Sequence, residues 1–120
     1  MVQQGDHKIE GGMEAMKRLL AMRVPPTAVM ASNDFTAIGA LGAAHAAGLK
    51  VPLDLSLVGF DDIAFAHWTQ PPLTTIMLSR TELAATALTA LERLFKKDNS
   101  RKEDYVITTH LVVRGSTRAI

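Results

Sequence analysis

Two adjacent carboxylates follow a short apolar stretch in the middle of the chain. Residues 55–60 read Leu-Ser-Leu-Val-Gly-Phe, and Asp61 and Asp62 come directly after them. Such a run is typical of a buried strand that is covered on both faces. In open α/β sheets, ligands bind beyond the carboxyl ends of the strands, so Asp61 is a candidate for holding a polar ligand. The alternative is that both aspartates only cap the next helical turn or close an Asx-turn.

A second polar turn follows an apolar stretch that lies earlier in the chain. Residues 27–31 predict a short buried strand, and the polar turn Ser32-Asn33-Asp34 comes next. We expect Asp34 to cap a helix over residues 35–47. Almost no charge falls in that helix, so both faces should be covered, one by the sheet and the other by a partner such as a second chain. Gly48 is predicted to end it in the left-handed conformation.

The remaining stretches alternate in the same manner. Asp6 is a candidate N-cap for a first helix with an apolar stripe from Ile9 to Leu20, in which Gly11 and Gly12 could allow close packing. Residues 63–68 form an apolar turn with the only tryptophan, which suits local packing or a dimer contact. A strand at 73–77 and a capping box that starts a helix after Ser79 follow. Residues 98–100 predict a loop, and 105–113 are strand-like.

This order predicts an α/β fold with a largely parallel sheet and helices on both faces. The chain has 120 residues, 13 basic and 12 acidic, so no global basic field is directed at nucleic acid. Cysteine is absent, which leaves no disulfide framework or thiolate metal site. No apolar run approaches the length that spans a bilayer, and the polar N-terminus is not a signal peptide.

Catalytic and cofactor motifs are also missing from the sequence. There is no phosphate-binding glycine motif, no nucleophile elbow and no zinc-protease motif, and the four histidines lack metal-ligand spacing. Asp61 and Asp62 are neighbours along the chain, whereas acid/base pairs usually face one substrate from separate elements. We therefore expect no metal, no cofactor and no enzyme, and the residues favour a module that binds a small ligand.

Four blocks of the sequence, in order and with matching spacing, resemble the LacI/GalR family of bacterial transcriptional repressors. The blocks are residues 26–41, 48–62, 71–76 and 112–117. The resemblance implies the C-terminal lobe, in part, of a type I periplasmic-binding-protein-like effector domain. In that family two α/β lobes close on a sugar or another small metabolite and thereby change the spacing of the DNA-binding headpieces.

The resemblance also implies the ligand contacts. Asp61 looks like the carboxylate that accepts hydrogen bonds from sugar hydroxyls, and Asn33 looks like the amide that both donates and accepts. His7 stands where an aromatic residue often stacks on the ligand, and Leu78 stands where a glutamine is frequent. These two departures argue against a simple hexose or pentose.

The family's regulatory dimer implies a second set of residues, on the helix at 35–47 and the turn at 63–68. They are Phe35, Ile38, Leu41, Gly42, Ile63, Phe65 and Trp68.

The resemblance predicts how the chain is organised. Residues 1–78 should form the C-terminal lobe, and residues 79–120 should cross to and from the other lobe. The helix-turn-helix domain is absent from this sequence and should lie upstream. The expected partners are a small-molecule effector, a second copy of the chain and, only through the missing domain, operator DNA, all in the cytoplasm and away from membranes. The alternatives are a periplasmic sugar-binding protein of a transporter and an enzyme on a doubly wound fold.

Overall fold

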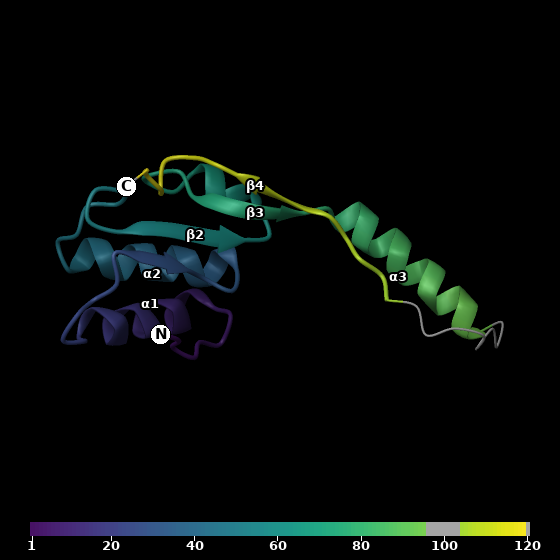
Figure 1. Ribbon diagram of the computed structural model, residues 1–120, viewed down its shortest axis with the longest axis horizontal. Coiled ribbons are helices and arrows are strands. Elements are labelled where there is room, and N and C mark those ends of the chain that lie inside the picture. The colour runs from purple at the N-terminus through teal and green to yellow at the C-terminus, as the bar shows by residue number, and fades with distance from the viewer. Residues whose placement is uncertain (96–103, 120) are drawn as a thin grey trace. The chain divides into compact units, whose positions relative to one another are not determined.

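A computed structural model describes residues 1–95 and 104–119 of the chain. The chain divides into two compact units, one made of Met1–Met77 with Leu111–Ile120 and the other of Leu78–His110. Figure 1 shows the course of the chain through both units. The predicted loop at 98–100 lies outside the described residues.

A four-stranded sheet contains β1 (Ala28–Met30), β2 (Ser56–Phe60), β3 (Thr74–Leu78) and β4 (Thr109–Val112), in the order β1-β2-β3-β4. Strand β2 runs parallel to both β1 and β3. The carboxyl ends of the three strands therefore lie along one edge of the sheet, which is the edge meant below by the carboxyl edge. The predicted mostly parallel α/β architecture is confirmed. The prediction that the stretch at 27–31 is buried was wrong for β1, because β1 is an edge strand and Met30 is 64% exposed.

Two helices build the main unit together with the sheet. Helix α2 (Asp34–Ala46) lies between the sheet and α1 (Ile9–Leu20), as Figure 1 shows. A Cβ on Gly12 would collide with the backbone of Thr36, and one on Gly39 would collide with the backbone of Ile9. The two helices approach each other this closely because both positions are glycine, so the expected close packing at Gly12 is confirmed.

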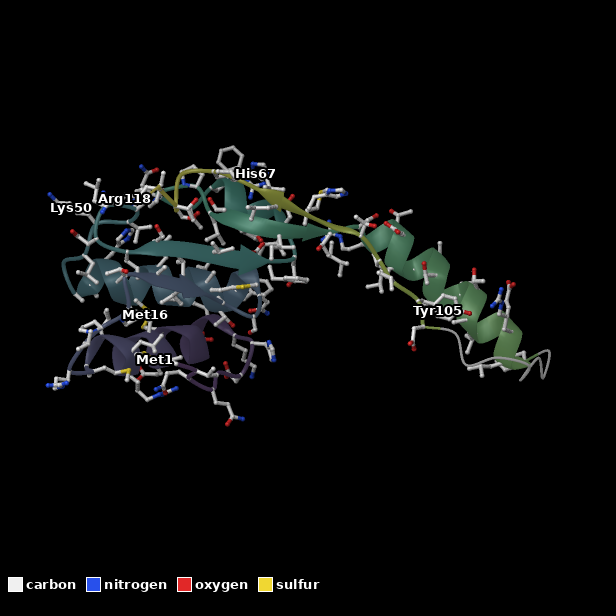
Figure 2. All side chains as sticks on the ribbon, viewed as in Figure 1. Met1, Met16, Lys50, His67, Tyr105 and Arg118 are labelled. Carbon is white, nitrogen blue, oxygen red and sulfur yellow. The ribbon has the colours of Figure 1, made fainter. Side chains whose placement is uncertain are left out.

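The core of this unit is built from small and branched apolar residues, and α2 contributes the largest share of them. Met16 of α1 is 1% exposed and lies between α1 and α2 (Figure 2). The C-terminal segment completes the core, because Ser116 is fully buried and bonds to two strands. Its Oγ donates to the carbonyl of Leu57 at 2.6 Å and accepts from the amide of Thr74 at 2.8 Å.

The helix ends differ from two of the predicted caps. Asn33, not Asp34, is the N-cap of α2, and its side chain accepts from the amide of Thr36 at 2.9 Å. Lys8, not Asp6, occupies the N-cap position of α1, while Asp6 accepts from the amide of Lys8. Asn33 and Asp34 have similar capping preferences, whereas the Lys8 side chain makes no capping hydrogen bond at the start of α1. Gly48 has a φ of 78°, which confirms the predicted left-handed end of α2.

The second unit contains α3 (Arg80–Phe95), which begins after the predicted capping residue. The Oγ of Ser79 accepts from the amide of Glu82 at 3.2 Å, which is one half of a capping box. No residue of α3 is buried among the described residues. Strand β4 falls within the predicted strand-like stretch, and the apolar turn at 63–68 contains the 3₁₀ helix η1 (Ala64–His67).

Candidate functional site

The carboxyl ends of β1 and β2 place the predicted ligand residues at one edge of the sheet. Met30, the last residue of β1, is in register with Val58 of β2. Asn33 follows shortly after β1, and Asp61 follows β2 directly. Because the strands are parallel, both residues lie beyond the same edge, which is where open α/β sheets bind ligands.

Asn33 and His7 come together in a small hydrogen-bonded group at this edge. The Nδ2 of Asn33 donates to the carbonyl of His7 at 3.0 Å, and the Oγ of Ser32 lies 3.1 Å from the His7 Nδ1. His7 has a φ of 62°, so its backbone is in the left-handed region. The Asn33 amide also caps α2, which leaves one N–H and one lone pair of its side chain beyond these two bonds.

Asp61 and Asp62 form a left-handed turn, with φ values of 111° and 53°. The amide of Asp61 donates to the carbonyl of Ile76 at 2.9 Å, and Asp62 Oδ1 accepts from Arg114 Nη2 at 2.6 Å. Helix η1 begins after Ile63, so neither aspartate occupies its N-cap position. Asp62 is thus a structural ion-pair partner, while Asp61 stands at the exact end of β2 on a turn held by long-range contacts.

A buried carboxylate supports this turn, and it belongs to Asp34, which was predicted to be a helix N-cap. Asp34 is 0% exposed; its Oδ1 accepts from the Thr75 hydroxyl at 2.6 Å, and its Oδ2 accepts from the Ile63 amide at 2.9 Å. A Cβ on Gly59 would collide with Asp34 Oδ1. The glycine inside a buried strand was the signal for a close approach, because a strand glycine often marks one.

A cavity of about 780 Å³ opens beside β1. Its lining includes His7 and Ser32, together with the N-terminal residues, α1 and β1. Asn33, Asp61 and Leu78 are not among its lining residues. Leu78 belongs to the second compact unit. Among the four predicted ligand residues, the structure links His7 with Asn33 and places Asp61 at the same sheet edge.

The predicted dimer residues differ in their accessibility. Phe35, Phe65 and Trp68 are exposed, Trp68 to 85%. Ile38 and Ile63 are half-buried, and Gly42 is exposed. Leu41 is 5% exposed and packs in the core, so it has too little surface for a contact between chains. The helical spacing that placed Leu41 beside Ile38 did not show which of the two faces the sheet.

Within residues 1–95 and 104–119, no group of three or more histidine, aspartate or glutamate side chains could hold a metal ion. No helix in that part of the chain is long and apolar enough to cross a membrane.

Comparison with known proteins decides the family. The periplasmic-binding-protein-like domain matches residues 1–117. The chain belongs to that domain family. As the sequence resemblance predicted, its relatives are LacI-type regulators, which are transcriptional repressors and not enzymes.

Three of these proteins illustrate the likeness. The repressor CytR of Escherichia coli K12 is 40% identical over 99% of this chain and 35% of its own length. The lac repressor dimer bound to operator and the anti-inducer ONPF is 33% identical, with a TM-score of 0.86 over 96% of this chain and 40% of that one. A LacI-family regulator from Enterococcus faecalis with bound ribose is 30% identical, with a TM-score of 0.80 over 95% and 42%. The chain spans about a third of the length of the curated relatives it matches.

Proposed function

We propose that this chain is part of a LacI-type transcriptional repressor and forms one side of its effector site. A small sugar-like effector binds at the carboxyl edge of the sheet, where Asp61 accepts hydrogen bonds from hydroxyls. Asn33, which follows β1, and His7, whose carbonyl accepts from Asn33, contribute polar contacts. Effector binding shifts the protein between two arrangements that differ in affinity for operator DNA, which a separate domain contacts in the cytoplasm.

The observation that carries this proposal is the shared edge of β1 and β2. The His7–Asn33 group and the Asp61 turn stand beyond parallel strands that end side by side. A carboxylate and an amide at one end of a sheet suit a ligand with several hydroxyl groups, because the carboxylate only accepts while the amide both donates and accepts. The ribose in a related regulator is a ligand of that chemical class.

Ligand binding to the full-length protein tests the proposal. A panel of pentoses, hexoses, nucleosides and nucleobases is screened by thermal shift, since a ligand that binds only the folded state raises the Tm. We expect at least one polyhydroxylated compound to raise the Tm. Asp61→Asn should then weaken its binding by roughly 10- to 100-fold, because a hydrogen bond to a charged group contributes about 1.5–3 kcal/mol.

Glu10→Gln is the matched control for this variant. Glu10 is an exposed carboxylate on α1, so its substitution removes the same charge from a different surface. The control should bind the ligand as the wild type does. Equal affinities of the Asp61→Asn and Glu10→Gln proteins, or a panel without any stabilising polyol, would contradict the proposed effector site.

We further infer that the protein forms a homodimer through an aromatic surface consisting of Phe35, Phe65 and Trp68, with Ile38, Gly42 and Ile63 beside them. Large exposed aromatic residues are enriched at such interfaces. Sedimentation of the full-length protein tests this surface. Phe65→Ser with Trp68→Ser should shift the protein toward monomer, whereas Leu53→Ser, at another exposed apolar residue, should not. A dimer unchanged by the double substitution would exclude this surface.

A further inference from the structure

Arg114 joins groups from three parts of the main unit. Its Nη1 donates to the carbonyl of Leu73 at 2.8 Å, and its Nη2 donates to Asp62 Oδ1 at 2.6 Å. The same Nη2 lies 3.0 Å from the Nε2 of His67. Its backbone amide donates to the Oγ1 of Thr74 at 2.9 Å. The guanidinium group therefore bridges the Asp61-Asp62 turn, the end of η1 and the start of β3.

The ion pair between Arg114 and Asp62 is largely shielded from water. The two side chains are 10% and 16% exposed. Arginine has only donors, so the contact with His67 is a hydrogen bond when the Nε2 of His67 accepts. Removing one partner of a shielded charge pair lowers the stability of the fold much more than removing one partner of an exposed pair. The reason is that the remaining charge is left buried and unpaired.

The turn that Arg114 contacts has a backbone that needs such support. Non-glycine residues with positive φ are uncommon, and Asp61 and Asp62 are two in succession. They persist where the surrounding structure holds them. Two contacts hold the main chain on either side, from Asp61 N–H to Ile76 and from Ile63 N–H to Asp34. The Asp62 side chain is held by Arg114.

We propose that Arg114 is a positioning residue of the effector site. By holding Asp62, it keeps the left-handed turn in the one conformation that presents Asp61 at the sheet edge. Arg114 belongs to the segment that begins at Leu111, where the chain re-enters the main unit after residues 78–110. The C-terminal segment thus sets the geometry of Asp61, a proposed ligand-binding residue that lies more than 50 residues earlier in the chain. The part of this proposal that concerns ligand binding rests on the proposed function.

Amide hydrogen exchange of the ¹⁵N-labelled 120-residue chain tests the positioning role without any ligand. In Arg114→Met, we expect the Asp61 and Ile63 amides to exchange about tenfold faster than in the wild type, because the turn opens locally. The Ala31 amide, which donates to Val58 between β1 and β2, should change by less than about twofold. Arg114→Lys should give an intermediate rate at the turn, because lysine keeps the charge but not the forked geometry.

Arg118→Met is the matched control on the same terminal segment. Arg118 is exposed, and the hydrogen bond described for it uses its backbone amide, so the substitution removes an arginine without touching the turn. Its exchange rates should equal those of the wild type. Unchanged Asp61 and Ile63 amides in Arg114→Met would overturn the proposal. A uniform acceleration that includes Ala31 would also overturn it, because Arg114 would then only stabilise the fold.

A binding measurement on the full-length protein separates this proposal from the proposed function. With the panel compound that raises the Tm most as the probe, Arg114→Met should raise its Kd about tenfold, because Asp61 and Asp62 are neighbours and their effects are coupled, and Arg118→Met should leave the Kd unchanged. If no panel compound binds, or Asp61→Asn leaves the Kd unchanged, the assigned ligand contact is wrong, and hydrogen exchange still decides the role of Arg114. If Asp61→Asn weakens binding and Arg114→Met does not, the positioning role is wrong.

Discussion

Helices α2 and α3 are both rich in alanine, but α3 has four leucines where α2 has one, and the two helices have opposite environments. Helix α2 has 13 residues, of which seven are buried, whereas none of the 16 residues of α3 is buried among the described residues. The leucines of α3 at positions 83, 88, 91 and 94 are all exposed. An apolar stripe in a sequence therefore indicates a face that can be buried, and only a neighbouring element decides whether it is.

The two helices also differ in how their apolar residues are used. In α2 the small residues let α1 and the sheet approach closely, so close packing on both sides holds the helix in place. In α3 the large residues are available for a partner that the described residues do not supply. The chain spans about a third of the length of its curated relatives, so we expect the rest of such a longer protein to cover this face.

The largest expected effect comes from the same substitution in the two helices. Leu41→Asn in α2 should destabilise the chain by about 4 kcal/mol, because it creates a cavity and buries an amide. Leu91→Asn in α3 should change the free energy of unfolding by less than about 0.5 kcal/mol, because Leu91 is exposed. Urea unfolding followed by circular dichroism measures both. Equal losses would show that α3 is packed in solution.

A second pair of substitutions tests the packing within α2. Gly39→Ala should cost about 3 kcal/mol, because the new Cβ would collide with the backbone of Ile9 in α1. Gly42→Ala should be neutral or stabilising by up to about 1 kcal/mol, because its Cβ would meet only the flexible end of Met13 at 3.8 Å. Urea unfolding at one fixed protein concentration compares them. A tolerated Gly39→Ala would mean that α1 moves freely over α2.

The buried start of α2 should show a smaller effect. Asp34→Ala should cost about 2 kcal/mol, because the Thr75 hydroxyl and the Ile63 amide lose their acceptor. Asp54→Ala is the control, since this exposed carboxylate accepts from the nearby Lys50 amide at 2.8 Å, and its loss should cost well under about 1 kcal/mol. Thermal unfolding of both variants gives the comparison. A Tm for Asp34→Ala that matched the control would contradict a supporting role for Asp34.

The smallest expected effect comes from an ion pair on the exposed face of α1. Like the residues of α3, the two side chains of this pair are not buried. A hydrogen bond from Lys17 at 2.7 Å lowers the pKa of the Glu14 carboxyl below its usual value, and the charges of Lys17 and Arg18 add to this. The pair's small stabilising contribution is thus present above the unfolded-state pKa and disappears as the pH falls through the folded-state pKa.

An NMR titration of the Glu14 carboxyl carbon measures this effect. Lys17→Met should raise the pKa of Glu14 toward its usual value, and Lys8→Met should leave it unchanged. Identical titration curves in all three proteins would show that the Glu14–Lys17 pair does not form in solution.

Local patterns in the sequence were sufficient for the element order, the parallel sheet and the left-handed end of α2 at Gly48. They also placed Asn33 and Asp61 after consecutive parallel strands, because strand and turn preferences depend on residues close together in the chain. The N-caps were less certain, because Asn33 and Asp34 have similar capping preferences and only the backbone geometry separates them.

The tertiary structure alone decided which polar residues near these turns support the fold through contacts with distant residues. Asp34 is buried against Thr75, 41 residues later, and Asp62 pairs with Arg114, 52 residues later. It also decided that Leu41 faces the core and that β1 is an edge strand. No local period encodes such contacts, because they depend on how distant segments pack, and packing is set by the shape of the whole core.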